Sequence, residues 1–341
     1  MTNRILRYAK LGPEDEYGSD TLPPVRATVD IASASLDVPE DTMAEYEGGI
    51  GRAPRLHRPG WYAPEGNIEW AADVDTLGWA LRWVLGGYLF TDGGGDDGHH
   101  LHEFYGSTST ELPSFAAWLG KDVFEHVFRG CVASSLQLEV SDGYAMLQLG
   151  VVAAKDEKGT IDEEVLASLP QPPPLTFPNV RFWVGGHDSA DEVSAAIRSL
   201  TLEIDNNTDA DGARGLGSRF AQRTPPAEQR ATTVQFTSHY SGTDHIERVW
   251  GSSDGPSEDG STELPLHLEA QVGDYGRLHV QLPRVVFSSV DTEPSGRDRI
   301  EQQVTATALL DDVQLDDDST VESELLARLH NDQDEYAYAA E

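Results

Sequence analysis

Apolar and polar side chains alternate along most of the longer regular stretches of this sequence, and this period of two constrains the fold more than any other feature. Residues 135–152, SLQLEVSDGYAMLQLGVV, alternate on both sides of the turn Ser141-Asp142-Gly143. Alternation places every second side chain on one face of a β-strand, and two such runs around a turn predict a hairpin. The pattern recurs in residues 197–204, 232–238, 264–272, 277–282 and 299–310.

The faces opposite the apolar positions are polar, with glutamine and threonine prominent in the last of these stretches. Strands with one apolar and one polar face belong to antiparallel sheets that are packed on one side and wet on the other. We therefore expect a mainly β protein, an antiparallel β-sandwich or barrel with short flanking helices. Three helices are predicted, over residues 74–87, 242–251 and 319–330, the last with a capping box formed by Ser319 and Glu322.

The order of predicted elements repeats. Each half contains a strand, a helix that ends at glycine, a long polar loop and a long β-run, and YAMLQLGVVAAKD in the first half parallels IEQQVTATALLDD in the second. The proline-rich stretch 169–180 lies between the halves. We expect residues 1–175 to form a first β domain with an N-terminal arm, residues 176–318 to form a second, and residues 319–341 to form a C-terminal helix and tail.

The chain is acidic along its whole length. Its 341 residues contain 59 Asp and Glu against 24 Lys and Arg, a formal net charge of −35. Molar salt shortens the Debye length to about 3 Å and screens self-repulsion, so a dispersed acidic excess of this size favours a halophilic source. A surface that grips DNA needs basic patches, and this class of protein is not expected.

Cysteine content and hydropathy point to a soluble protein. Cys131 is the only cysteine and lies among apolar residues, so we expect a buried thiol and no disulfide. The N-terminal residues lack the apolar core of a signal peptide. The longest apolar stretch, residues 77–90, contains Arg82 and is too short to span a bilayer.

One acidic loop has the alternating oxygen side chains of a calcium site, at Asp205, Asn207, Asp209 and Asp211. Counted from Asn207, the twelfth position is Ser218, where an EF-hand has glutamate, and a strand rather than a helix precedes the loop. We expect no dedicated metal site here, and the four residues stay weak candidates.

His100 and His102 are a second weak metal candidate. A strand would place them on one face, as in zinc sites built on sheets, but the glycine-rich residues before them favour a surface loop. His187, Asp188 and Ser189 are adjacent in sequence and cannot converge as a catalytic triad. We expect no enzyme activity and no cofactor.

Three stretches carry a resemblance. Residues 66–87 are a strand and a helix that closes on glycine; residues 199–238 are a strand ending in Asn-Asn, a glycine-rich loop and the next strand; residues 283–309 are a strand, a Ser-Gly-Arg-Asp turn and a long strand. Together and in this order they resemble the major tail tube proteins of long-tailed, siphovirus-like viruses, over about residues 45–315. The acidic composition adds a halophilic archaeal host to this interpretation.

The resemblance implies two packed antiparallel sheets whose subunits form rings, with the inner sheets joined into one barrel. Rings would be assembled in the host cytoplasm and stack into the tail tube of a virion, and DNA would pass through the lumen without specific binding. Tail terminator, tape measure and baseplate proteins would be the other partners, and no contact with a membrane is expected. Glu301, Gln303, Thr305 and Thr307, on the polar face of their strand, are the candidates to line the lumen.

The resemblance also implies six tube domains per layer. With two domains in each chain the ring is a homotrimer with pseudo-sixfold symmetry, and with one domain per chain it is a homohexamer. Two other classes stay open on the residues alone. A halophilic secreted or surface β-sandwich that binds carbohydrate needs an exposed aromatic platform and would be a monomer at high salt. A β-rich hydrolase would lose turnover when a single Asp, His or Ser is replaced.

Overall fold

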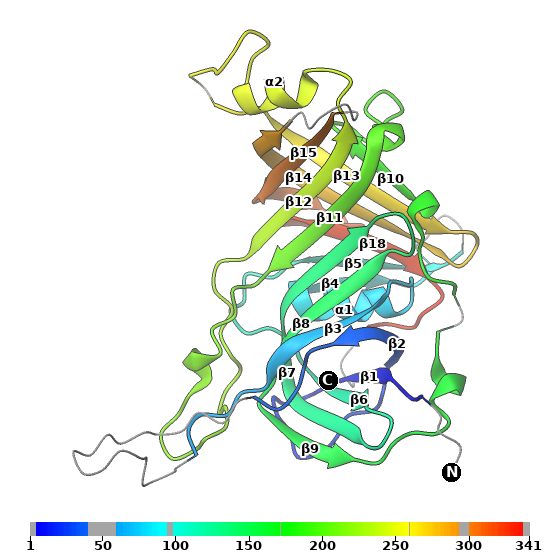
Figure 1. Ribbon diagram of the computed structural model, residues 1–341, viewed down its shortest axis with the longest axis vertical. Coiled ribbons are helices and arrows are strands. Elements are labelled where there is room, and N and C mark those ends of the chain that lie inside the picture. Colours follow the sequence, from blue (N-terminus) through cyan, green and yellow to red (C-terminus); the bar gives the residue numbers. More distant parts are fainter. Residues whose placement is uncertain are drawn as a thin grey trace, which may run out of the picture.

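The computed structural model describes residues 5–39, 59–93, 98–170, 172–258, 260–292 and 300–336. Antiparallel strands dominate, which confirms the mainly β prediction, and two α-helices accompany them in the described residues. Figure 1 shows an elongated molecule with most strands of the first half of the chain in its lower part and most strands of the second half in its upper part.

Six strands of the first half close into a barrel, which we call the first strand set. Hydrogen-bonded neighbours follow the order β1-β2-β3-β8-β7-β6, and β6 pairs with β1 to close the circle. The strands are β1 (Tyr8–Pro13), β2 (Ala27–Ala34), β3 (Glu65–Ala71), β6 (Ser114–Gly120), β7 (Glu125–Val140) and β8 (Met146–Val152).

Six strands of the second half, the second strand set, follow the order β10-β13-β14-β15-β12-β11. Read in the direction β1-β6-β7-β8-β3-β2, the first strand set has the same order, with β1 matching β10 and β2 matching β11; the second strand set is open between β10 and β11. The strands are β10 (Val180–Val184), β11 (Ile197–Asp205), β12 (Ala231–His239), β13 (Glu263–Val272), β14 (Gly276–Asp291) and β15 (Glu301–Leu309).

The irregularities of the two strand sets also correspond. The β2–β3, β6–β7 and β7–β8 pairs each contain a register shift, and so do their counterparts β11–β12, β13–β14 and β14–β15. An extra residue in one strand fixes the local register and bends the sheet. Shifts at corresponding places therefore provide fixed points for comparing the two sets residue by residue.

The two sets are joined edge to edge by β7 and β11. Residues 135–140 of β7 pair antiparallel with residues 200–205 of β11, which places Leu136 opposite Ile204. Both side chains are buried. The core is accordingly continuous across the join, with one large cluster of apolar residues drawn from both sets.

Asn206, directly after β11, fastens the join with its side chain. Its Nδ2 donates to the carbonyl oxygens of Val84, at 2.9 Å, and Ala133, at 3.1 Å. Its Oδ1 accepts a hydrogen bond from Nε of Arg230 at 2.9 Å. Because this fully buried amide forms hydrogen bonds through both Nδ2 and Oδ1, it fixes the position of the first strand set relative to the second.

Helix α1 (Thr76–Leu85) lies inside the molecule, whereas α2 (Asp244–Trp250) lies on its surface. The carboxylate of Asp73 accepts the backbone N–H groups of Asp75 and Thr76 and so caps the start of α1. Nine of the ten α1 residues are buried, and no residue of α2 is. Both helices were predicted from the sequence, and Cys131 is buried as expected.

The predicted C-terminal helix over residues 319–330 is wrong. This region forms the hairpin β16 (Asp311–Gln314) and β17 (Thr320–Ser323), followed by β18 (Leu326–Asn331). Strand β18 pairs with β14 on one edge and with β5 on the other. The helical spacing of leucines was compatible with either structure, and hydrogen bonding on both edges of β18 decides for the strand.

The remaining elements extend the sheet or connect strands. Strand β9 pairs with the start of β7 as β18 pairs with the start of β14, and β4 pairs with β5. They are β4 (Gly86–Thr91), β5 (His100–Gly106), β9 (Lys155–Gly159) and the short 3₁₀ turns η1 (Val165–Ser168), η2 (Phe177–Asn179), η3 (Ser194–Ala196) and η4 (Asp211–Ala213).

Candidate functional site

A polar face runs without interruption across six paired strands and spans the join between the two strand sets. Strands β3, β8, β7 and β11 run side by side obliquely across Figure 1, and β12 and β15 continue the sheet. One row of paired residues across it reads Glu69, Gln148, Gln137, Glu203, Thr233 and Thr307. The next row reads Met146, Glu139, Thr201, Gln235 and Thr305. We call this surface the polar sheet face.

The polar sheet face is acidic to neutral. Arg198, at the β11 bulge, is the one Lys or Arg in β3, β8, β11, β12, β15 and residues 134–140 of β7. Six carboxylates occupy its outward positions: Glu65, Glu69, Glu139, Glu203, Asp205 and Glu301. A surface with six carboxylates and a single arginine repels a phosphate backbone.

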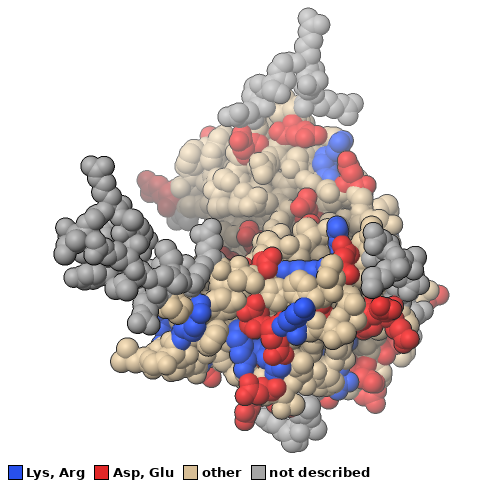
Figure 2. Space-filling view, turned by 60° about the horizontal axis from the view of Figure 1, so that its bottom comes forward, with Lys and Arg blue, Asp and Glu red and all other residues tan. Residues whose placement is uncertain are grey.

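Basic side chains gather elsewhere. Figure 2 shows Lys and Arg interspersed with Asp and Glu on the face that includes the lower end of Figure 1. Three of the four lysines form ion pairs and the fourth lies over an aromatic ring: Lys10 with Glu125, Lys121 with Asp37, Lys155 with Asp20, and Lys158 over Phe124. All four lysines thus have partners within the first half of the chain.

The four residues predicted to line a lumen lie on the polar sheet face. Glu301, Gln303, Thr305 and Thr307 are the outward, alternate positions of β15, and the residues between them are mostly buried. Thr305 and Thr307 pair with Gln235 and Thr233 of β12, so the candidates continue the two rows described above. That they face a lumen stays a prediction.

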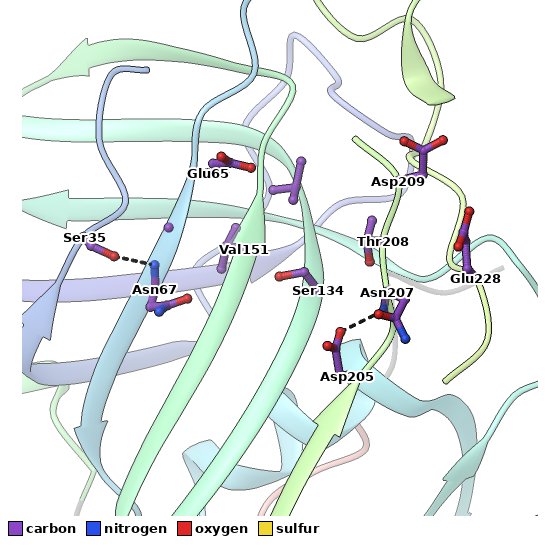
Figure 3. A pocket seen from close by; sticks show the side chains of 12 residues that line it. Ser35, Glu65, Asn67, Ser134, Val151, Asp205, Asn207, Thr208, Asp209 and Glu228 are labelled. Atoms are coloured by element: carbon purple, nitrogen blue, oxygen red, sulfur yellow. Dashed lines mark hydrogen bonds between the residues drawn. The ribbon is translucent and has the colours of Figure 1, made fainter. Parts of the chain in front are cut away.

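An open pocket of about 840 Å³ lies at one end of the polar sheet face. Figure 3 shows Glu65 and Asn67 of β3 on one side and Asp205, Asn207 and Asp209 on the other. The N–H of Asn207 donates to Oδ1 of Asp205 at 2.8 Å, which turns the chain sharply after β11. With Glu228 also in its lining, the pocket is a concentration of negative charge.

The structure divides the four calcium candidates. Asp205, Asn207 and Asp209 line the pocket, whereas Asp211 belongs to η4 and forms an ion pair with Arg214 at 2.6 Å. Among the described residues, no group of three or more His, Cys, Asp or Glu is placed to hold a metal ion.

The surface-loop interpretation of His100 and His102 is wrong, because both belong to strand β5. They share a face, with ring centroids 6.4 Å apart, but they have different partners. His102 is buried and shares a 2.9 Å hydrogen bond with the Tyr88 hydroxyl, and burial lowers its pKa to about 4. His100 contacts the carboxylate of Asp92 at 2.9 Å. This histidine pair is therefore part of the packing around β4 and β5.

One catalytic pattern in the sequence has the wrong structural setting. Residues 251–255, Gly-Ser-Ser-Asp-Gly, fit G-x-S-x-G, but they follow helix α2 and lie in a loop. A nucleophile elbow places its serine between a strand and a following helix.

Comparison with known proteins agrees with the geometry. The sequence matches the family described as phage tail tube protein over residues 6–308. This chain belongs to the phage tail tube protein family. The match begins nearer the N-terminus than the resemblance in the sequence suggested, and it includes both strand sets as far as Ala308 of β15. A search of curated proteins gives no match.

Family membership gives the chain a structural role as a tail tube component of a virion, which self-assembles in the tail. It favours a non-enzymatic role and does not favour a carbohydrate-binding module. In the described part of the chain, no helix is long and apolar enough to cross a membrane.

Sequence reasoning singled out lumen candidates on β15 alone and named none on the other five strands of the polar sheet face. Gln137, Gln148, Glu203 and Gln235 show the same alternation of polar and apolar residues that singled out β15. The signal was present in each strand, but only pairing shows that these positions form one surface.

Proposed function

We propose that this protein forms homotrimeric rings that stack into the tail tube of a virus, through which DNA is delivered to the host. The observation that carries the proposal is the edge-to-edge join of two alike strand sets, with a polar sheet face that continues across the join. The family match supports the tail tube role.

Three chains give a ring of six strand sets. Residues 1–175 and 176–318 would then be two tube domains, each built around one strand set, with β16, β17 and β18 as an addition to the second. The β7–β11 join already connects the domains within a chain, and an equivalent join between chains would close the ring. Closure also pairs edges that would otherwise invite uncontrolled association.

In such a ring the polar sheet face would be the wall of the lumen. Hydroxyl, amide and carboxylate groups would keep the wall hydrated, and the negative charge would hold the DNA backbone off it. The DNA would therefore move through without specific binding. Tail terminator, tape measure and baseplate proteins would complete the tail.

A virus of a halophilic archaeon fits the composition. A net charge of −35 on 341 residues repels itself strongly in dilute salt and is screened in molar salt. Assembly in the host cytoplasm would then take place at high ionic strength.

Cryo-electron microscopy of the purified protein in molar salt tests the proposal. The expected result is tubes whose layers each contain three chains and six similar densities. Layers of six identical chains would contradict the trimer and leave the tail tube role intact. A protein that stays monomeric at high concentration and over a range of salt would contradict the assembly itself.

A further inference from the structure

The strands of the β7–β11 join each have a counterpart in the other strand set: β14 corresponds to β7, and β2 corresponds to β11. In the described part of the chain, these two counterparts do not pair with each other. The register shifts fix the correspondence: Ile31 and Ser33 flank the shift in β2, and Ile197 and Ser199 flank it in β11. The backbone continues to correspond beyond the end of β2. The N–H of Ser35 donates to the carbonyl of Asn67 at 2.9 Å, just as Thr201 pairs with Gln235.

The sequences agree with this correspondence. Residues 31–38, IASASLDV, and residues 197–204, IRSLTLEI, share Ile, Ser and Leu and differ conservatively at three further positions. The other partner of the join behaves in the same way. The shifts in β7 and β14 align residues 132–136, VASSL, with residues 286–290, VFSSV. Val38 therefore corresponds to Ile204, and Val290 corresponds to Leu136.

Val38 and Ile204 occupy corresponding positions but differ in exposure. Ile204 is 0% exposed because it lies in the join opposite Leu136. Val38, at the equivalent place in the first strand set, is 57% exposed. The exposure of Val38 in the single chain is explained if a strand of another chain covers this side chain in the assembly.

Both edges are available in the described chain. Residues 289–291 of β14 pair with β15 on one side, and β13 reaches only to Val286 on the other. In the described residues no strand pairs with the free side of residues 289–291, or with the free side of residues 35–38. These are the two edges that a join between chains requires.

We propose that residues 36–38 of one chain pair antiparallel with residues 290–292 of a second copy, with Val38 opposite Val290 and Asp37 opposite Asp291. This inference rests on the proposed function and specifies its chain-to-chain contact. The register is that of Ile204 with Leu136 and Glu203 with Gln137. The ion pair of Asp37 with Lys121, at 3.0 Å, would offset the repulsion between Asp37 and Asp291 across this pairing.

Disulfide trapping tests the register directly. Directly opposed residues of antiparallel strands lie about 4.5–5.5 Å apart between Cα atoms, within the range that a disulfide spans. The native Cys131 is fully buried and does not interfere. The double variant Val38→Cys/Val290→Cys, assembled in molar salt and oxidised, should give cross-linked dimers and trimers on a non-reducing gel, with the ladder ending at three chains.

A matched control uses Val123, which is 85% exposed and lies in the turn between β6 and β7. Val123→Cys/Val290→Cys should assemble equally well and give no ladder. A mixture of the two single variants Val38→Cys and Val290→Cys should give dimers and no trimers.

The outcomes separate the inference from the proposed function. Assembled tubes with no cross-link between positions 38 and 290 would overturn the pairing and leave the tail tube proposal standing. A ladder that continues to six chains would support the pairing and contradict the three-chain ring.

A second pair of variants covers the case in which the cysteines disturb assembly. Val38→Asp should unfold at the same temperature as the parent protein, because this side chain is largely exposed in the single chain. It should also fail to form rings, since a carboxylate would be buried in the join without a partner. Val123→Asp should form rings normally, and rings formed equally by both variants would overturn the pairing.

Discussion

Replacing Asn206 by alanine tests how the two strand sets are held together. The side chain is fully buried and donates to the carbonyls of Val84 and Ala133, which belong to α1 and β7. Each buried polar group that loses its partner costs about 1–3 kcal/mol. Arg230 would keep its bonds to Glu324 and to backbone carbonyls, so we count only the two carbonyls. The expected loss is about 4 kcal/mol.

This loss converts to a temperature shift through the entropy of unfolding. At about 2.1 cal/mol/K for each residue, 341 residues give about 0.7 kcal/mol/K, so Asn206→Ala should lower the melting temperature by about 6 °C. Differential scanning calorimetry in molar salt measures it. The control is Asn67→Ala, a half-exposed amide on the polar sheet face, which should shift the melting temperature by less than about 1 °C. A shift in Asn206→Ala no larger than in this control would refute the reasoning.

Four further outcomes are expected. The melting temperature should fall steeply between molar and about 0.1 M salt, because the net charge of −35 is then unscreened, and a flat profile would contradict a halophilic origin. Asp209→Asn/Asp211→Asn should have the same melting temperature as the parent with or without calcium. A calcium-dependent stabilisation of the parent that the variant lacks would support a calcium site in this loop. Burial, with neighbouring His187, lowers the pKa of His267 to about 4 and of His279 to about 3, against about 6.5 when unfolded. The free energy of unfolding should therefore fall as pH drops from about 6.5 towards 4, and it should fall less in His267→Gln/His279→Gln. Equal slopes by calorimetry for the parent and this variant would exclude the two histidines as the source of the pH dependence. Tubes of Gln303→Lys/Thr305→Lys should retain DNA on sedimentation at reduced salt while parent tubes do not, and equal retention would argue against a lumen at these positions.

Local patterns determined the elements whose two faces differ. Alternation predicted the hairpin of β7 and β8 around its Ser-Asp-Gly turn. An apolar stripe ending at glycine predicted α1, and start and stop residues predicted α2, because these signals depend on residues close in sequence. The repeated element order was also readable. The residue-by-residue match of the two repeats was not readable. The bulges match Gln148 with Gln303, whereas the parallel between YAMLQLGVVAAKD and IEQQVTATALLDD is shifted by one residue.

Tertiary pairing decided what the local pattern left open. Val321, Leu325 and Leu329 fit a helical stripe, but hydrogen bonds to β14 and β5 on both edges make residues 326–331 a strand. His102 lies next to a glycine-rich loop, yet pairing with β18 places it in the interior beside Tyr88. The polar sheet face and the exposed Val38 edge exist only because strands distant in sequence lie side by side. The sequence by itself determined which face of each strand is polar, and the long-range pairing of the strands decided that those faces form one surface.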